Sequence, residues 1–276
     1  MPYRTLAALA AGAALVAAAG AALSQAPPAG PFPSADQALA DARLASFRFR
    51  QGEYGVVHDA AARLEAAVQA HPRDGRLWNA LGVAYFEHIT ADFQTNSFKD
   101  IPGHLRKAQA AHEQALALNP DDPVALAGRA TAYAIAAGFT RELDIGRRGI
   151  ADLNRAAQMA PDEPAIRLQR AFTNLGVAAE LRDRAAAETD LAHLIRLSEG
   201  SRPGDVLHVL LGDLHLEGGK PDLARKEYAV AARTGSAIRD LGEARLASLA
   251  AGGPRPAEIT RLRNEIGRNC TLCHSY

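Results

Sequence analysis

Two cysteines and a histidine near the end of the chain have the types and spacing of a covalent cofactor site. They read Cys270-Thr271-Leu272-Cys273-His274, and these are the only two cysteines among 276 residues. Positions three and four apart share one face of a helical turn, so both thiols and the imidazole can address one flat macrocycle. C-x-x-C-H is the attachment signature of a c-type haem. The pattern therefore predicts one covalent haem c, bonded to Cys270 and Cys273, with His274 as the proximal iron ligand.

A C-x-x-C pair has other uses. A thioredoxin-like dithiol needs a βαβ context, and no such pattern surrounds residue 270. Half of a zinc site would usually be accompanied by a second cysteine pair. A structural disulfide or a chance match is the remaining alternative. The haem interpretation is favoured because the other end of the chain carries an export signal.

The first residues have the organisation of a secretory signal. Arg4 supplies a positive charge, residues 6–23 are uncharged and rich in alanine, and Ser24-Gln25-Ala26 offers small residues for cleavage. We therefore expect a signal peptide over residues 1–26, a bacterial periplasmic location, and no integral membrane segment after cleavage. An uncleaved membrane anchor is the alternative, although alanine is only weakly hydrophobic.

Composition limits the remaining functions. The charges balance, with 31 basic and 31 acidic residues, which gives no reason to expect a nucleic-acid partner. Residues 27–34 are rich in proline and glycine and are expected to form a disordered leader. No metalloprotease motif, nucleophile elbow or phosphate-binding loop is present, so the chain is not expected to be an enzyme.

The middle of the chain repeats a two-part pattern. The first copy is Trp78-x2-Leu81-Gly82-x2-Tyr85 with Ala108-x3-His112-x2-Ala115-x4-Pro120, and another is His208-x2-Leu211-Gly212-x2-His215 with Ala224-x3-Tyr228-x2-Ala231. The second half recurs at Ala60-Leu64-Ala67-Pro72, Gly149-Leu153-Ala156-Pro161 and Ala187-Leu191-Leu194. The pattern resembles the tetratricopeptide repeat (TPR), a helical hairpin of 34 residues.

This resemblance implies an all-α, TPR-like solenoid of about five repeats over residues 35–250, including a last helix over 237–249. A linker at 251–256 and a C-terminal helix at 257–276, which carries the haem motif, would follow it. The resemblance also implies a right-handed superhelix with a concave groove lined by the first helix of each pair. We expect a segment to dock in this groove, and the C-terminal helix of the same chain is the first candidate. In this register the groove would be lined by Val124, Ala127, Ile135, Leu168, Phe172, Leu175, Val206, Val209 and Leu216.

The second axial position of the haem iron decides its chemistry, because a sixth ligand favours electron transfer and an open position permits binding of small molecules. Met159 is the only methionine after the signal segment. His88 and His104 lie in an insertion, roughly 87–105, that we expect to form a loop on one face of the solenoid. These three residues are the candidate distal ligands, and a histidine from a partner molecule is an alternative.

Together these features predict an exported monohaem c-type cytochrome on a TPR scaffold. It would exchange single electrons with a redox partner protein or complex subunit docked on the TPR surface. The alternatives are a TPR adaptor of a periplasmic complex in which the haem is structural, and a haem-based gas sensor. Self-association, including a filament, is also compatible with a solenoid.

Overall fold

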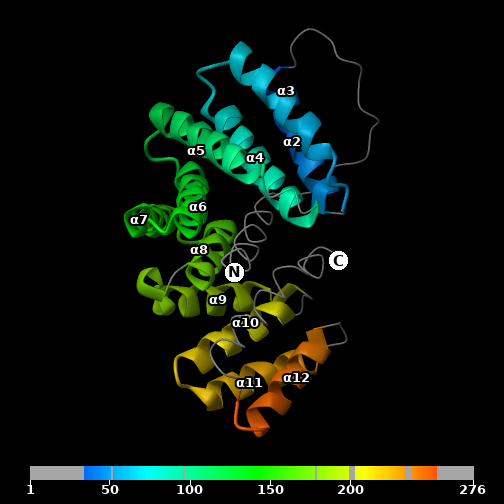
Figure 1. Cartoon of the computed structure of the whole chain (residues 1–276), viewed down its shortest axis with the longest axis vertical. Coiled ribbons are helices and arrows are strands. Elements are labelled where there is room, and N and C mark those ends of the chain that lie inside the picture. Colours follow the sequence, from blue (N-terminus) through cyan, green and yellow to red (C-terminus); the bar gives the residue numbers. More distant parts are fainter. Residues whose placement is uncertain are drawn as a thin grey trace.

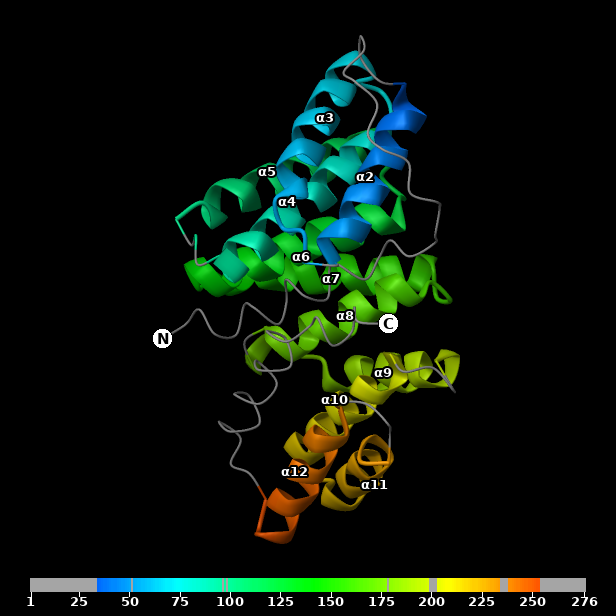
Figure 2. The same cartoon turned by 90° about the vertical axis from the view of Figure 1, so that its right-hand side faces the viewer.

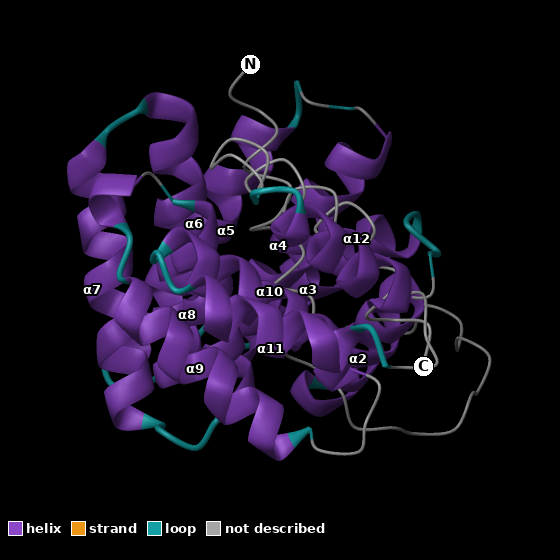
Figure 3. Ribbon diagram, turned by 90° about the horizontal axis from the view of Figure 1, so that it is seen from below, coloured by secondary structure: helices purple, strands orange, loops and turns teal. Residues whose placement is uncertain are grey.

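A computed structural model describes residues 34–50, 52–95, 97, 99–177, 179–198, 203–233 and 238–253. The predicted signal peptide, the leader up to residue 33, and the C-terminal helix with its haem motif lie outside these ranges. All regular structure in the described ranges is helical (Figure 3). The predicted all-α class is therefore confirmed. No helix in these ranges is both long and apolar enough to cross a membrane.

The helices follow one another in pairs, with a single helix after the last pair. They are α2 (Ala35–Arg50), α3 (Val56–Ala70), α4 (Gly75–Thr95), α5 (Ile101–Leu118), α6 (Pro123–Thr140), α7 (Leu143–Met159), α8 (Pro164–Gly176), α9 (Arg184–Leu197), α10 (Pro203–Glu217), α11 (Pro221–Ala231) and α12 (Ile238–Ala250), with a short 3-10 helix, η3 (Ala179–Leu181). The helix predicted over 237–249 matches α12.

The pairs stack along the long axis of the molecule, from α2–α5 at one end to α10–α12 at the other (Figures 1 and 2). Each helix packs against its neighbours in the chain, and α2, α4, α6 and α8 also contact one another in sequence. A single hairpin cannot bury its apolar face alone, and stacking joins these faces into a continuous core. This is the architecture of a helical-hairpin solenoid.

Local sequence signals fix where several helices begin. Pro123, Pro164 and Pro221 each stand in the first turn of a helix, where the missing N–H removes no helical hydrogen bond. Asp122 caps α6, because its Oδ1 accepts hydrogen bonds from the backbone N–H of Val124 (2.9 Å) and Ala125 (3.1 Å). The starts of α6, α8 and α11 are therefore set by residues that lie in, or just before, the first turn of each helix.

Glycines let neighbouring helices approach closely, as the repeat pattern predicts. A Cβ added to Gly82 on α4 would lie 2.5 Å from the His112 ring on α5, and one on Gly212 would lie 2.4 Å from the Tyr228 ring. Ala108 and Ala224, the other small residues of the pattern, are completely buried. Both copies of the pattern therefore perform the same packing role.

The insertion over residues 87–105 differs from the loop that the sequence predicts. Helix α4 continues to Thr95 and α5 begins at Ile101, so most of the insertion lengthens the hairpin. The added turns of α4 are stabilised as helix because they pack against the neighbouring hairpin, α2–α3. Ala91 packs with Phe49 at the end of α2 and Val57 at the start of α3.

The prediction that nine apolar residues line an exposed groove is wrong for most of them. Seven of the nine side chains belong to the hydrophobic core clusters, namely Ala127, Ile135, Leu168, Phe172, Leu175, Val206 and Val209. Only Val124 and Leu216 are half-buried. These positions are apolar because they pack the solenoid, and a repeat register read from sequence does not separate that role from an exposed lining.

Candidate functional site

The residues predicted to attach the haem, Cys270, Cys273 and His274, lie outside the described part of the chain. Their roles remain predictions from the sequence. The three candidate distal ligands, Met159, His88 and His104, are all described. The structure places the two histidines in one cluster, and it places Met159 elsewhere.

Three histidines from successive helices meet where the long hairpin packs on α3. The His88 ring on α4 lies 4.5 Å from the His58 ring of α3 and 4.6 Å from the His104 ring of α5, measured between ring centroids. Tyr85, one turn before His88, stacks on His104 at 6.5 Å. We call His58, Tyr85, His88, Asp92 and His104 the histidine cluster.

His88 is the enclosed member of the cluster. Its side chain is 5% exposed, and Nε2 lies 3.0 Å from the carbonyl oxygen of Val57. A carbonyl only accepts, so Nε2 carries the hydrogen and Nδ1 presents a lone pair, which has no hydrogen-bond partner among the described residues. Burial, with the nearby charges of His104 and His58, lowers the His88 pKa to about 4. The ring is therefore neutral at pH 7.

His104 is held by a carboxylate. Its Nδ1 lies 2.8 Å from Asp92 Oδ2, and its side chain is 21% exposed. The carboxylate accepts this hydrogen bond, so Nδ1 is the protonated nitrogen and the lone pair of the neutral ring is on Nε2. Burial raises the pKa of Asp92, and the bond to His104 acts in the opposite direction. A histidine oriented in this way by a carboxylate is the usual second-shell arrangement of a metal ligand.

Tyr85, which stacks on His104, also contacts two charged side chains. The Tyr85 hydroxyl donates to Glu65, and the Lys107 ammonium lies 5.0 Å from the centre of the Tyr85 ring. Burial and the Glu65 carboxylate both raise the pKa of the Tyr85 phenol. This hydroxyl is therefore kept protonated and serves as a hydrogen-bond donor.

The cluster is not a preformed metal site. Across the described ranges, no three His, Cys, Asp or Glu side chains are arranged so that they could hold a metal ion. His88 Nδ1 and His104 Nε2 nevertheless take part in no described hydrogen bond. Of these two side chains only that of His104 is partly exposed, and the third histidine of the cluster, His58, is exposed. Chemically, the cluster can offer one oriented nitrogen to an electrophile that arrives from outside.

Met159 has a different setting. It is the last residue of α7 and is 38% exposed. The thioether is therefore accessible, but its flexible side chain is not held in place by close packing.

The sequence reasoning named His88 and His104 but missed Asp92 and His58. One signal for Asp92 was available, because positions 88 and 92 are four apart and so share a face of α4. No local signal could join His58 to the cluster, since it approaches from another hairpin.

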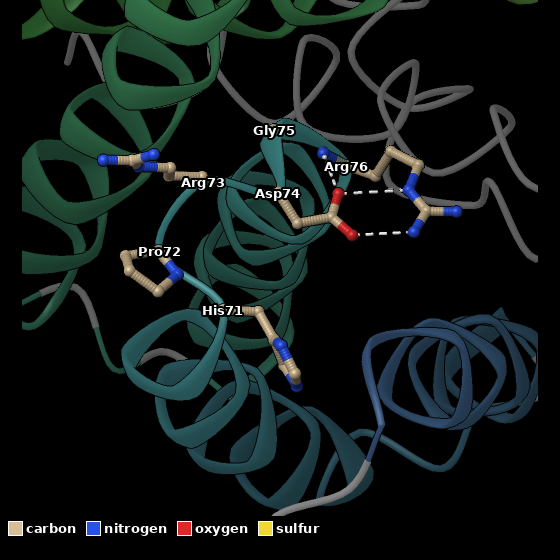
Figure 4. Close-up of a pocket in the computed structure, with 6 residues that line it drawn as sticks. All are labelled: His71, Pro72, Arg73, Asp74, Gly75 and Arg76. Atoms are coloured by element: carbon tan, nitrogen blue, oxygen red, sulfur yellow. Dashed lines mark hydrogen bonds and ion pairs between the residues drawn. The ribbon is translucent and has the colours of Figure 1, made fainter.

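A surface pocket of about 620 Å³ lies at the turn between α3 and α4. Its lining residues are His71, Pro72, Arg73, Asp74, Gly75 and Arg76 (Figure 4). Asp74 Oδ2 accepts a 2.7 Å bond from Arg76, while the side chains of Arg73 and His71 point away from this pair (Figure 4). The charged groups therefore do not converge on a ligand position.

Comparison with known proteins bears on the fold. No family model and no curated protein sequence matches this chain. Among solved structures, the chain is similar to the crystal structure of a thermophilic TPR protein of Thermus thermophilus. The TM-score is 0.52 and the identity 21%, over 78% of this chain and 99% of that one. The TPR-like solenoid predicted from the repeats is thereby confirmed.

Proposed function

We propose that this protein is an exported monohaem c-type cytochrome built on a TPR-like scaffold. The observation that carries the proposal is the C-x-x-C-H motif, which contains both cysteines of the chain. The haem supplies reversible one-electron chemistry when bound. Cys270 and Cys273 tether it, and His274 binds the iron. The scaffold presents a surface to a redox partner protein.

The experiment is expression of the full chain in a bacterium that carries haem-maturation machinery. We expect haem to remain with the polypeptide on a denaturing gel, at one haem per chain by pyridine haemochrome assay. Cys270→Ala and Cys273→Ala together should abolish that attachment. The matched control is Met159→Ala, which leaves the attachment chemistry untouched. A wild-type chain without covalent haem contradicts the proposal.

Electron transfer to a protein requires a further measurement. The reduced holoprotein, mixed with a small oxidised c-type cytochrome in a stopped-flow instrument, should reoxidise in a bimolecular reaction. A holoprotein that retains its electron over the whole accessible concentration range would not be an electron carrier.

The second candidate is a TPR-like adaptor that organises a protein complex without redox chemistry. The fold favours it, since stacked hairpins offer an extended binding surface. The two candidates differ in what the tail contributes. A chain ending at residue 253 should lose electron transfer if the cytochrome proposal holds, whereas an adaptor would assemble the same complex without the tail.

A further inference from the structure

Helix α8 has a glutamine at a buried position where the helices before and after it in the stack, α6 and α10, have leucine. The position lies two residues before the small residue of the repeat pattern, and it reads Leu126 in α6, Gln169 in α8 and Leu210 in α10. The small residues that define this register are Gly128, Ala171 and Gly212. Gln169 is 7% exposed, and both leucines are 1% exposed. The stack therefore carries a polar side chain in its interior at one interface between hairpins.

The Gln169 amide bonds α8 to α6. Its Nε2 donates to the carbonyl oxygen of Ala127 (3.0 Å) and to the hydroxyl of Thr131. The Thr131 hydroxyl itself donates to the Ala127 carbonyl at 3.1 Å. A second polar contact joins α8 to α7, where Arg170 Nη1 lies 3.3 Å from Asn154 Oδ1. Hydrogen bonds therefore hold the middle of α8 against the preceding helix pair.

The apolar core divides at the same interface. Most buried apolar side chains of α8 belong to a cluster with α9, α10, α11 and α12, namely Leu168, Ala171, Phe172 and Leu175. Ile166, in the first turn of α8, belongs instead to the cluster of α5, α6 and α7. Just after α8, Val177 and Leu181 pack with Ala134 of α6. The apolar clusters that cross this interface therefore lie near the two ends of α8, and the polar contacts lie between them.

We infer that the solenoid has a hinge where an N-terminal block, α2–α7, meets a C-terminal block, α8–α12 (Figure 2), and that Gln169 fixes the angle between the blocks. Separating apolar surfaces exposes hydrocarbon to water, whereas water replaces the lost partners of an exposed amide. This interface therefore opens at a lower cost than its neighbours. A change in the angle between the blocks alters the curvature of the stack, so that it can adjust to a protein that contacts both.

The test measures distances in the full chain by double electron–electron resonance. Cys270→Ala and Cys273→Ala remove the native thiols. Spin labels are then attached to Arg73→Cys in the α3–α4 turn and Lys226→Cys on α11, both at exposed positions in different blocks. A second pair, Arg73→Cys with Ala151→Cys on α7, lies within the N-terminal block. We expect a broad distance distribution for the first pair and a narrow one for the second.

Substitutions of Gln169 should change the first distribution in opposite directions. Gln169→Leu supplies the side chain found in α6 and α10 and should narrow it. This change strands no acceptor, because the Ala127 carbonyl keeps its bond from the Thr131 hydroxyl. Gln169→Glu at pH 8 should broaden the distribution, since an ionised carboxylate cannot donate to that carbonyl. Gln158→Leu makes the same chemical change at an exposed position of α7 and should leave the distribution unchanged.

Two outcomes overturn the inference. One is a wild-type distribution between the blocks that is no broader than the one within the N-terminal block. The other is a folded Gln169→Leu variant whose distribution is as broad as that of the wild type. Far-UV circular dichroism checks the fold of each variant, and the wild-type comparison needs no substitution of Gln169. Neither outcome bears on the proposed function, because both tail cysteines are replaced in these chains.

Discussion

His112 shows how one side chain can fix the packing of two helix pairs. Its ring is completely buried between Gly82 of α4 and Gly128 of α6, and its Nδ1 lies 2.9 Å from Asn79 Oδ1. Burial, together with the nearby positive charge of Arg129, lowers its pKa to about 3. The ring is therefore a flat neutral wedge, in the position where the TPR pattern has an aromatic residue.

The lowered pKa of His112 makes the free energy of unfolding depend on pH. The unfolded ring titrates near 6.5 and the folded ring near 3, so the unfolded state binds more protons between these values. The His112 contribution is therefore complete above pH 6.5 and falls, by up to about 1.4 kcal/mol per pH unit, as the pH drops towards 3. His112→Phe should reduce the loss of unfolding free energy between pH 7.5 and 5.0 by up to about 2 kcal/mol in urea titrations.

The control for that prediction is His71→Ala, because His71 is exposed. It should keep the wild-type pH dependence. His88, whose pKa is lowered to about 4, titrates in the same direction and leaves part of the acid sensitivity in His112→Phe. An unchanged pH dependence in His112→Phe would show that the buried ring does not carry the predicted penalty.

Two glycines in helices, Gly128 and Gly103, allow a matched test of how much stability depends on close packing between helices. A Cβ on Gly128 would lie 2.3 Å from His112 Cε1, whereas a Cβ on Gly103 of α5 meets nothing within 4 Å. Gly128→Ala should lower the free energy of unfolding by about 1–3 kcal/mol through overpacking. Gly103→Ala should raise it by up to about 1 kcal/mol, since alanine favours the helix. Denaturant titrations of both variants at pH 7.5 test this, and equal effects of the same sign would contradict it.

At the scale of helices, α12 is fastened to the solenoid by a buried ion pair. Arg245 Nε lies 2.7 Å from Asp213 Oδ1 of α10, which also accepts a 2.7 Å bond from the Tyr228 hydroxyl of α11. Arg245 and Asp213 are 2% and 1% exposed, so the three helices share one fully buried polar network. A buried ion pair adds little stability compared with apolar residues of the same size. Removing one partner, however, leaves the other charge buried without a counterion.

Arg245→Met should therefore destabilise α12 by about 3–5 kcal/mol, because it leaves the Asp213 carboxylate buried without its main partner. The double variant Asp213→Leu with Arg245→Met should recover much of that loss. Hydrogen exchange measured on α12 peptides, with α4 peptides as the reference, reports the change. A double variant no more protected than Arg245→Met alone would argue against a stranded charge.

The repeat pattern in the sequence predicted the helices correctly, but it did not predict the contacts that they make with other hairpins. Trp78, Gly82 and Tyr85 mark the packing face of α4 correctly, because the repeat pattern records which positions meet the paired helix. The pattern does not record what lies beyond the repeat. Ala91 is buried only because Phe49 and Val57 come from another hairpin, so the helical extension of α4 could not be anticipated. The bond between Asp92 and His104 depends on the same extension, and this is why the histidine cluster was predicted only in part.

The described helices form a linear stack, and this limits how far the effect of a substitution can spread. Each helix contacts near neighbours in the chain, so stability is approximately a sum of terms for the hairpins and their interfaces. Gly128 belongs to α6, in the middle of the stack, whereas Arg245 belongs to α12, the single helix at one end (Figure 2). Neither residue shares a described partner with the other.

The double variant Gly128→Ala with Arg245→Met should therefore lose stability equal to the sum of the single losses, within about 0.5 kcal/mol. Hydrogen exchange should rise in α4–α7 for Gly128→Ala and in α10–α12 for Arg245→Met, with little overlap. If Gly128→Ala loosened α12 as much as α6, the stack would unfold as one cooperative unit. Under independent hairpins, a disturbance at α12 leaves the histidine cluster on α3–α5 intact, so Arg245→Met should not change hydrogen exchange in α3–α5.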